Sequence, residues 1–461
     1  MTKRPDFRAA SASGRDLAVE IVYICDQDGA FAHAAWSRAL SGRNLDMRER
    51  RLGMELAFGS IRRKKTLDWC IAKAAGRSVH DIDPLALSLL RIGAYQLLFM
   101  SRIPAHAAVS ESVESARRLG HPKVAGFINA ALRRIASPRF DPGFPDMAAH
   151  PVKSLAVTLS YPEWLVESWI GQFGLEATER MLNAGNEPPA VMLRANTRRV
   201  SRDELAERLG GVATEPGRYA PEALRIVGPI ESVESLPGFA EGLFSVQDES
   251  SMLVAHVLGH PRVVIDACAA PGGKATHIAE LARDEARVVA CDISALRVAL
   301  VRESALRLGL RSVEAIECDA RELPTEWAGK ADAVLVDAPC TGLGVLARRA
   351  DARWRKGPGD IAKLAPVQAE ILAAAAACVA PGGVLVYSTC TVGRAENSDQ
   401  AEAFLHRHPD FRPSPLAPHM PSDAAGALCD GDSHMLQLLP GISGTDGFFI
   451  ARFVRPSAMA Q

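Results

Sequence analysis

The chain has 461 residues, which is too long for a single hydrophobic core, so two or three domains are expected. Hydrophobic residues make up 48% of the sequence and charged residues 23%, as in globular proteins, and no uninterrupted apolar run of about 18 residues predicts a transmembrane helix. The formal net charge of −1 excludes a basic signature over the whole chain, so nucleic-acid binding would have to depend on local basic patches.

The amino-terminal residues and the cysteine pattern both favour a cytoplasmic protein. The first residues are polar and lack the apolar segment of a secretory signal, and we expect residues 1–14 to form a disordered leader. The nine cysteines show no Cys-x-x-Cys pair and lie mostly in apolar runs, which favours free thiols over disulfides. The 12 histidines show no metal-binding spacing along the sequence, so we expect no metal site.

Residues 15–140 predict a bundle of helices with short connections. Leu17, Ile21 and Ile24 lie on one helical face, and the nearly all-apolar helix that begins at Pro84 must be buried. Basic residues cluster at three places along these helices, where solvation of a helix face explains them as well as RNA contact does. These clusters are Arg48, Arg50 and Arg51, then Arg62, Arg63, Lys64 and Lys65, then Arg133 and Arg134.

A small α+β subdomain is expected over residues 150–240, after a proline-rich linker. Its first part, from Tyr161 to Met181, predicts two amphipathic helices with Trp164 and Trp169 in the core. Strand periodicity follows, and three arginines among these segments are candidates for contact with phosphate. They are Arg194, Arg198 and Arg199.

A catalytic domain is expected over residues 241–456, and its central element is a strand, a glycine turn and a helix. Residues 263–265 form an apolar strand that ends at Asp266, and residues 271–273, Pro-Gly-Gly, build the turn. Glycines let backbone N–H groups approach a ligand closely, and the helix N-terminus adds positive charge. The turn lacks the G-x-G-x-x-G fingerprint, so NAD is not indicated. A second strand ends at Asp292, whose carboxylate could accept both hydroxyls of a ribose.

Strands and helices alternate through the rest of this domain. Such alternation predicts a doubly wound, mostly parallel α/β sheet with ligands at the carboxyl ends of the strands. One strand ends at Cys318-Asp319, and two others end in cysteine-bearing turns. The first of these turns runs from Asp337 to Cys340, and the second contains Cys390.

Three motifs in this order and spacing carry a family resemblance: DACAAPGGK from Asp266, DAPC from Asp337, and STC ending at Cys390. On these motifs the chain resembles the Sun-type RNA (cytosine-5)-methyltransferases of bacterial 16S rRNA, which use S-adenosylmethionine. Its helical segments ELAFGSIRRKKTLDW, LRIGAYQLL, IPAHAAVSESVE and FINAALRR resemble the NusB-type RNA-binding domain. Together the resemblances cover most of the chain.

Methylation at carbon 5 of a cytosine requires covalent activation of the ring, because that carbon is a poor nucleophile. A thiolate that adds to carbon 6 turns the ring into an enamine-like species, which can attack an electrophilic methyl group. Cys340 and Cys390 both lie at strand ends, as does the carboxyl of Asp337. The residues alone do not decide which thiol attacks, since reactivity depends on the thiolate fraction.

The resemblance implies a role for each matching residue. Cys390 would be the nucleophile, Cys340 would assist release of the covalent product, and Asp337 would contact the cytosine ring and the methyl end of the donor. Asp292 would bind the ribose, and Asp319 the adenine end. The cofactor-binding positions carried over are Cys268, Ala269, Ala270, Pro271, Gly272, Gly273, Lys274, Asp292, Asp319 and Asp337.

A basic run with one aromatic residue follows the first cysteine turn and suits an RNA backbone with a stacked base. It comprises Arg348, Arg349, Arg353, Trp354, Arg355 and Lys356. Family members usually read Arg-Arg-His-Pro-Asp here, whereas residues 348–351 read Arg-Arg-Ala-Asp. We expect this difference to bear on the RNA target rather than on the chemistry.

The resemblance implies a NusB-like helical bundle, a small α+β subdomain and a class I, Rossmann-like methyltransferase sheet. The expected activity is methyl transfer from S-adenosylmethionine to carbon 5 of a cytosine in unassembled 16S rRNA, through a covalent cysteine adduct at carbon 6. A cytoplasmic monomer without membrane or metal is expected. Two alternatives stay open: a tRNA cytosine-5 methyltransferase, and a NusB-like RNA-binding factor with an inert methyltransferase domain. An amino-group methyltransferase would prefer a Pro-Pro-aromatic turn where residues 338–340 read Ala-Pro-Cys.

Overall fold

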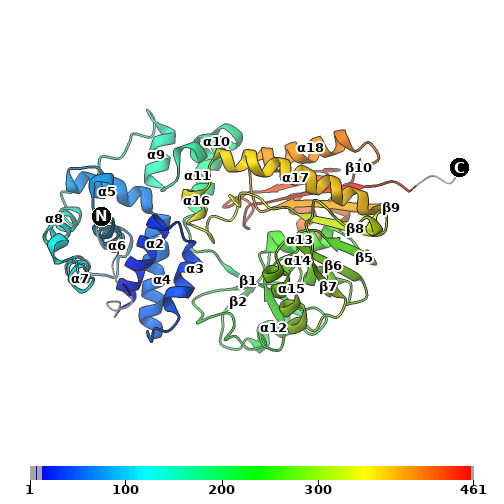
Figure 1. Cartoon of the computed structure of the whole chain (residues 1–461), viewed down its shortest axis with the longest axis horizontal. Coiled ribbons are helices and arrows are strands. Elements are labelled where there is room, and N and C mark those ends of the chain that lie inside the picture. Colours follow the sequence, from blue (N-terminus) through cyan, green and yellow to red (C-terminus); the bar gives the residue numbers. More distant parts are fainter. Residues whose placement is uncertain (1–6, 8–12, 458–461) are drawn as a thin grey trace. The chain divides into compact units, whose positions relative to one another are not determined.

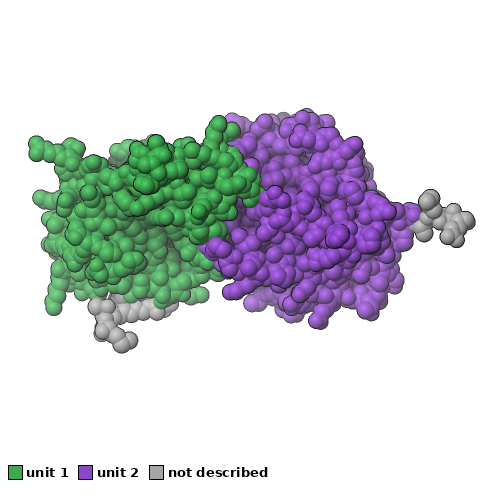
Figure 2. Space-filling view, turned by 90° about the horizontal axis from the view of Figure 1, so that it is seen from above, with its two compact units in different colours: residues 1–186, 349–355 green, residues 187–348, 356–461 purple. Residues whose placement is uncertain are grey.

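The computed structural model describes residue 7 and residues 13–457, and the chain divides into two compact units. Unit 1 comprises residues 1–186 and 349–355, and unit 2 comprises residues 187–348 and 356–461 (Figure 2). The expected leader over residues 1–14 lies almost entirely outside the described residues. Figure 1 shows the order of the elements along the chain.

Unit 1 is a helical bundle, as predicted, and local capping fixes where its helices begin. The Ser13 hydroxyl accepts a hydrogen bond from the Asp16 N–H, and the Asp83 carboxylate accepts two from the first turn of the helix that Pro84 opens. That helix is nearly all apolar and mostly buried. The helices are α2 (Gly14–Gln27), α3 (Ala32–Leu40), α4 (Met47–Arg62), α5 (Lys64–Ala75), α6 (Pro84–Phe99), α7 (Ala105–Arg118), α8 (Ala125–Ile135), α9 (Pro151–Thr158), α10 (Glu163–Phe173) and α11 (Leu175–Ala184).

Two segments join unit 1 from outside the expected bundle. Helices α9 to α11 belong to unit 1, so the region expected as one α+β subdomain is divided between the units after residue 186. The second segment is residues 349–355, which include the short helix α16 (Ala352–Arg355) and follow the catalytic strands in sequence.

The smaller sheet of unit 2 has four antiparallel strands in the order β2-β3-β1-β4. Its helix α12 (Arg202–Arg208) begins with a capping box between Ser201 and Glu204. Leu193, Leu205 and Phe244 are fully buried in the core of this layer. The strands are β1 (Val191–Ala195), β2 (Thr214–Pro216), β3 (Ala223–Ile226) and β4 (Phe244–Val246).

The larger sheet of unit 2 has eight strands in the order β10-β12-β9-β8-β5-β6-β7, and β11 also pairs with β12. Strands β5 to β9 are parallel, and β12 lies antiparallel to β9. The predicted mostly parallel, class I sheet is therefore confirmed. The strands are β5 (Val263–Asp266), β6 (Arg287–Asp292), β7 (Val313–Glu317), β8 (Ala331–Asp337), β9 (Val379–Thr389), β10 (Arg412–Pro413), β11 (Met435–Leu438) and β12 (Phe448–Val454).

Helices cover both faces of this sheet, because successive strand residues point to opposite sides. Val264 packs on the face covered by α13 (Glu249–Val257), α14 (Gly273–Leu281) and α15 (Ala295–Leu308), whereas Ile265 packs on the opposite face. That opposite face carries α17 (Pro358–Cys378) and α18 (Ser398–Arg407); α19 (Ser422–Leu428) packs on the first face. The chain order reverses between β5 and β8, and ligands of such sheets bind at this switch point.

Helix α17 is the one helix among the described residues that is long and apolar enough to cross a membrane, with a mean hydropathy of 1.4 over its best window. Ile371, Leu372 and Ala375 pack it against the larger sheet. Its apolar character thus has an explanation in the core of unit 2.

Candidate active site

The turn after β5 leaves the backbone open at the start of α14. Gly272 has a φ of 104°, a conformation that favours glycine, and a Cβ there would come within 3.1 Å of the Val301 Cα. No side chain caps α14. Its first backbone N–H groups have no acceptor within the helix, and with the helix dipole they favour an anionic ligand group.

The rest of this turn is held by backbone contacts to the neighbouring strand. The Ala269 N–H donates to the Cys291 carbonyl at 2.7 Å, and the Ala270–Pro271 peptide bond is cis. Burial raises the pKa of Cys268 well above its ordinary value, so this cysteine stays a neutral thiol. The turn residues predicted to bind a cofactor thus follow the carboxyl end of β5 directly, and one backbone hydrogen bond joins them to β6.

Asp266 ends β5 with a carboxyl group that no hydrogen bond of good geometry reaches. Its side chain is fully buried, and neither oxygen has a hydrogen bond of good geometry among the described residues, although the backbone of Cys268 lies near enough to act on its charge. Burial, reinforced by the charge of Asp337, raises the pKa of Asp266 from its ordinary 3.8 to about 7. A buried, unpartnered carboxyl is unfavourable until a cationic or hydrogen-bonding group reaches it.

Asp292 ends the adjacent strand β6 and is nearly buried. Its carboxylate accepts from the Ser294 N–H at 3.1 Å and lies 3.2 Å from the Arg297 guanidinium. Arg297 also donates to the Ala270 carbonyl at 2.8 Å, so this arginine contacts both Asp292 and the glycine turn. Asp292 thus lies beside the turn, as a ribose-binding carboxylate would.

Asp319 follows β7 and is bound to its near neighbour Arg321. The guanidinium lies 2.6 Å from one carboxylate oxygen, and the Arg321 N–H donates to the other at 2.9 Å. These contacts hold the pKa of Asp319 below its ordinary value. The carboxylate remains partly exposed, and it lies one strand further along the same sheet edge as Asp292.

Lys274 and Asp337 meet between the glycine turn and the end of β8. The Lys274 ammonium lies 2.6 Å from one Asp337 oxygen, and the Ser388 hydroxyl donates to the other at 2.9 Å. Burial alone would lower the pKa of Lys274, but the contact with Asp337 outweighs it and the pKa is raised. The lysine therefore stays charged, and its charge also acts on Cys390.

Cys340 and Cys390 lie side by side at the ends of two neighbouring strands, with their sulfur atoms 3.3 Å apart. The hydrogen bond to Cys390, together with burial, raises the pKa of Cys340 well above its ordinary value. Cys340 therefore keeps its proton and can donate it toward the other sulfur. The sequence placed both cysteines at strand ends, and the structure brings them into direct contact.

A buried polar network that the sequence analysis missed holds the two cysteine turns together. Glu396 is fully buried, and its carboxylate accepts from the Thr341 N–H at 2.9 Å and from the Gln368 amide at 3.0 Å. The same amide of Gln368 donates to the Pro339 carbonyl. On the other turn, Asn397 accepts from the Thr389 hydroxyl and donates to the Thr391 carbonyl. Only the position of Glu396 and Asn397, shortly after Cys390, could have indicated them.

The interpretation of Arg194 as a phosphate contact is wrong. Its guanidinium is fully buried and forms a two-point ion pair with Glu280 of α14, at 2.8 and 2.9 Å. Arg198 donates to the Gly309 carbonyl at 3.1 Å, and Arg199 donates to the Glu241 carbonyl, so both have partners within unit 2. Arg194 of β1 therefore joins the smaller sheet to α14, the helix that follows the glycine turn.

The interpretation of the basic run after Cys340 is wrong for its central residues. Arg353 is fully buried in unit 1, where it donates to the Gly185 carbonyl at 2.8 Å and covers the Tyr161 ring. The Trp354 indole donates to the Ile61 carbonyl at 2.7 Å and packs against the hydrophobic core of unit 1. Arg348 binds Asp248 and Asp446 in unit 2.

Some of the basic residues of unit 1 remain at its surface. Arg48, Arg51, Arg133 and Arg134 are exposed, whereas Lys64 and Lys65 are paired with Asp26 and Glu163 at 2.6 and 2.8 Å. The first and third of the three predicted clusters are therefore the more accessible ones.

Three family models match consecutive parts of the chain. The NusB family matches residues 12–137, the ferredoxin-like domain of the RsmF/B-like methyltransferases matches residues 161–233, and the 16S rRNA methyltransferase RsmB/F family matches residues 258–454. A Bacillus subtilis protein named "Probable ribosomal RNA small subunit methyltransferase B" is 38% identical over 445 residues, which are 95% of this chain and 98% of that protein. The chain belongs to the RsmB/F family of 16S rRNA methyltransferases.

Solved structures extend this likeness to three dimensions. The crystal structure of PH0851 covers 96% of the chain and 99% of its own length, with a TM-score of 0.79 and 26% sequence identity. NSun6 from Pyrococcus horikoshii, solved with SFG, covers 65% of the chain and 99% of its own length, with a TM-score of 0.58 and 25% identity. As a member of the family, the chain is an rRNA methyltransferase with a NusB-like helical domain, a ferredoxin-like domain and a mixed-sheet methyltransferase domain.

Proposed function

We propose that the chain transfers the methyl group of S-adenosylmethionine to carbon 5 of a cytosine in 16S rRNA, with Cys390 as the nucleophile at carbon 6. The observation that carries this proposal is the contact between Cys340 and Cys390, 3.3 Å apart, beside the Lys274–Asp337 pair. Two thiols and a carboxyl group lie at the ends of adjacent strands, and Lys274 reaches that carboxyl group from the first turn of α14. A thiol nucleophile and an acid are the groups that covalent methylation of cytosine needs.

The crevice suits S-adenosylmethionine by its charges. The donor carries a sulfonium and an ammonium group, and Asp266 offers a buried carboxyl that lacks a partner. Asp292 lies at the end of the neighbouring strand, in the position for a ribose. The open N-terminus of α14 suits the donor's carboxylate. When bound, the donor supplies an electrophilic methyl group. NSun6, a structural relative, was solved with the S-adenosylmethionine analogue SFG.

The surroundings of the two cysteines favour Cys390 as the nucleophile. The Cys340 thiol keeps its proton, so it can donate a hydrogen bond to a Cys390 thiolate. The charge of Lys274 stabilises that thiolate from the other side. Asp337, held by Lys274 and Ser388, points at the same edge and is the proposed contact for ring nitrogen 3.

In the proposed reaction, the Cys390 sulfur bonds to carbon 6 of the cytosine while a proton neutralises the charge that develops at nitrogen 3. Carbon 5 then takes the methyl group, and the sulfur–methyl bond of the donor breaks. Loss of the carbon 5 proton to a base restores the double bond as the carbon 6–sulfur bond breaks and returns the Cys390 thiolate, and nitrogen 3 then gives back the proton that it took up in the first step. Cys340, adjacent to this bond, is proposed to assist the release. The target base must leave its stack to reach the thiols.

We further propose that the substrate is 16S rRNA before subunit assembly, bound by a cytoplasmic monomer. The NusB family match over residues 12–137 and the exposed arginines of unit 1 support RNA as the partner. The relatives that are named ribosomal RNA small subunit methyltransferase B support the small-subunit rRNA as the substrate class.

Denaturing gel electrophoresis of the Cys340→Ala protein tests mechanism and substrate together. After incubation with S-adenosylmethionine and unmethylated 16S rRNA, we expect a slow band that ribonuclease removes, because release of the adduct is blocked. The band must vanish in the Cys340→Ala/Cys390→Ala double variant and must persist in Cys340→Ala/Cys429→Ala. No adduct with 16S rRNA but a clear adduct with tRNA would overturn the substrate. No adduct with either RNA, despite normal donor binding, would overturn the mechanism.

A further inference from the structure

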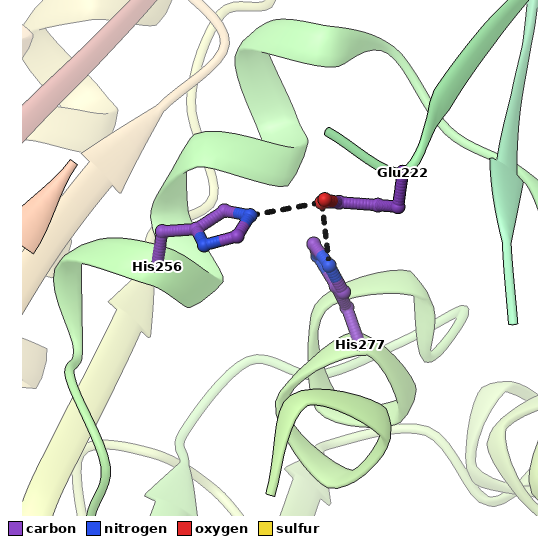
Figure 3. Close-up of side chains that lie close together, drawn as sticks. All are labelled: Glu222, His256 and His277. Atoms are coloured by element: carbon purple, nitrogen blue, oxygen red, sulfur yellow. Dashed lines mark hydrogen bonds and ion pairs between the residues drawn. The ribbon is translucent and has the colours of Figure 1, made fainter. Parts of the chain in front are cut away.

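Three side chains that lie far apart in sequence converge in unit 2, outside the cysteine turns. Glu222 precedes β3, His256 lies near the end of α13, and His277 lies in the first turns of α14 (Figure 3). Both histidine rings point at the Glu222 carboxylate, and one oxygen lies 2.9 Å from Nε2 of each ring. The three ligand-type atoms lie within 4.8 Å of one another.

Hydrogen bonds within this cluster do not satisfy all of its buried polar atoms. Glu222 and His277 are both about 1% exposed at their side chains, yet neither ring nitrogen of His277 has a hydrogen bond of good geometry. Its Nε2 lies close to the carboxylate oxygen but outside the direction in which an N–H could donate. A buried imidazole is unusual when its Nδ1 has no partner and its Nε2 meets the Glu222 oxygen without good donor geometry, and a bound ion would account for it.

The cluster offers the donor atoms that zinc prefers. Glu222, His256 and His277 contribute one carboxylate oxygen and two imidazole nitrogens. The buried guanidinium of Arg194 is already paired with Glu280 at 2.8 Å.

We propose that Glu222, His256 and His277 form a binding site for a divalent transition-metal ion of the zinc class. Zinc bonds to nitrogen and oxygen of about 2.0–2.2 Å put neighbouring donor atoms about 3.0–3.5 Å apart, so two donor pairs at 2.9 Å need only a small outward shift. Two histidines and one glutamate leave a fourth position for water. His256, whose side chain is 16% exposed, gives that position access to solvent.

The place of the site in the fold gives the ion a structural role. Glu222 belongs to the smaller sheet, where its backbone carbonyl accepts from the Ala195 N–H at 2.9 Å. His256 and His277 lie on two helices that cover the larger sheet, and α14 begins at the glycine turn. A metal ion here would hold the ferredoxin-like layer against the helix that borders the donor site, in parallel with the Arg194–Glu280 pair.

Calorimetric titration of the full-length, chelator-treated protein with Zn²⁺ tests the proposal. We expect one equivalent of zinc per chain and a higher melting temperature after its addition, because binding to the folded state stabilises it. His256→Ala should weaken zinc binding at least about 100-fold, since it removes one of only three protein ligands. The matched control is His260→Ala, which removes an exposed histidine four residues further along and should bind zinc like the wild type.

A second variant keeps the test decisive if a buried histidine cannot be replaced without unfolding. Glu222→Gln keeps the size and the hydrogen-bonding capacity of the side chain, so the protein should fold but bind zinc at least about 100-fold more weakly. With Co²⁺ as a spectroscopic probe, the visible absorption of the wild type should be lost in both ligand variants and kept in His260→Ala. The proposal is wrong if the wild type binds no stoichiometric zinc, or if the ligand variants bind it unchanged.

Discussion

The two halves of the active site differ in how far their polar groups are satisfied before any ligand binds. Around the cysteines, Glu396 accepts from Thr341 and Gln368, and Asn397 binds the residues beside Cys390, while the amide oxygen of Gln368 lacks a partner. At the end of β5, neither oxygen of Asp266 has a hydrogen bond of good geometry, and Asp292 is covered by the largely exposed Arg297. The difference indicates that the protein itself holds the two cysteine turns, whereas the proposed donor site keeps a buried carboxyl group for its ligand.

The largest effect is expected from removing Cys390, the proposed nucleophile. Cys390→Ala should lower methyl transfer to 16S rRNA at least about 10⁴-fold, because the covalent route is lost. Donor affinity should stay unchanged, since Cys390 lies outside the glycine turn. Transfer of a radiolabelled methyl group and calorimetric donor binding measure the two effects. Cys429→Ala is the control, and normal turnover by Cys390→Ala would disprove the assignment.

Breaking the network behind the thiols should show whether it positions them. Glu396→Ala removes the acceptor of the Thr341 N–H and the Gln368 amide, and we expect kcat to fall about 10²-fold with little change in donor affinity. Glu396→Gln keeps one acceptor oxygen and should recover part of the loss. A fall in kcat that matches an equal loss of folded protein, measured by circular dichroism, would show a role in stability alone.

The proposed donor site, where Asp266 lacks a hydrogen bond, can be tested by replacing that residue. Asp266→Asn should weaken donor binding about 10-fold, because a buried charge–charge contact with the donor is lost. Titration calorimetry of both proteins at pH 8 measures this difference. Donor binding by Asp266→Asn as tight as that of the wild type would show that the orphan carboxyl does not meet the donor.

The same substitution should change how stability depends on pH in the ligand-free protein. Below pH 3.8 the Asp266 carboxyl is protonated in both the folded and the unfolded state, so it does not lower the free energy of unfolding. As the pH rises from 3.8 to about 7, the unfolded state ionises first, and the wild type loses up to about 4 kcal/mol of unfolding free energy. Asp266→Asn should lack this loss, which urea unfolding at pH 5 and pH 8 can measure.

The smallest effect is expected at Arg297, which covers Asp292 in the ligand-free crevice. Arg297→Ala removes an exposed ion pair and one contact to the Ala270 carbonyl, so donor affinity should change by no more than about 3-fold. The same calorimetric titration provides the measurement. A loss of donor affinity of 10-fold or more would mean that Arg297 binds the donor directly. The donor site would then contain a preformed ligand contact, as the cysteine turns do.

The sequence predicted the strand ends well and the partners of charged side chains poorly. Asp266, Asp292, Asp337 and the two cysteines could be placed because parallel strands bring their carboxyl ends to one edge of a sheet. Nothing local distinguishes a buried arginine such as Arg194 from a solvated one. Its burial depends on Glu280, 86 positions away, which only the folded chain brings close.

The same limit explains the missed histidine cluster and the misjudged basic run. His256 and His277 are separated by 21 positions and by a strand, so no spacing rule for metal ligands applies to them. Arg353 and Trp354 follow a catalytic strand in sequence but pack in unit 1, because the chain returns there for seven residues. Propensity and periodicity predict local structure from neighbours along the chain. The contacts of the histidine cluster, Arg353 and Trp354 join segments that are far apart in sequence.

That return has a consequence for the order in which the protein can be made. Arg353 donates to carbonyls of Ser160 and Gly185 and covers the Tyr161 ring, so the amino-terminal unit lacks one of its buried side chains until residue 353 has been synthesised. At about 5–20 residues per second, a ribosome needs about 10–30 s to add the stretch from residue 186 to residue 353. During translation the helical unit therefore stays incomplete until residues 349–355, which are encoded inside the methyltransferase domain, have been added.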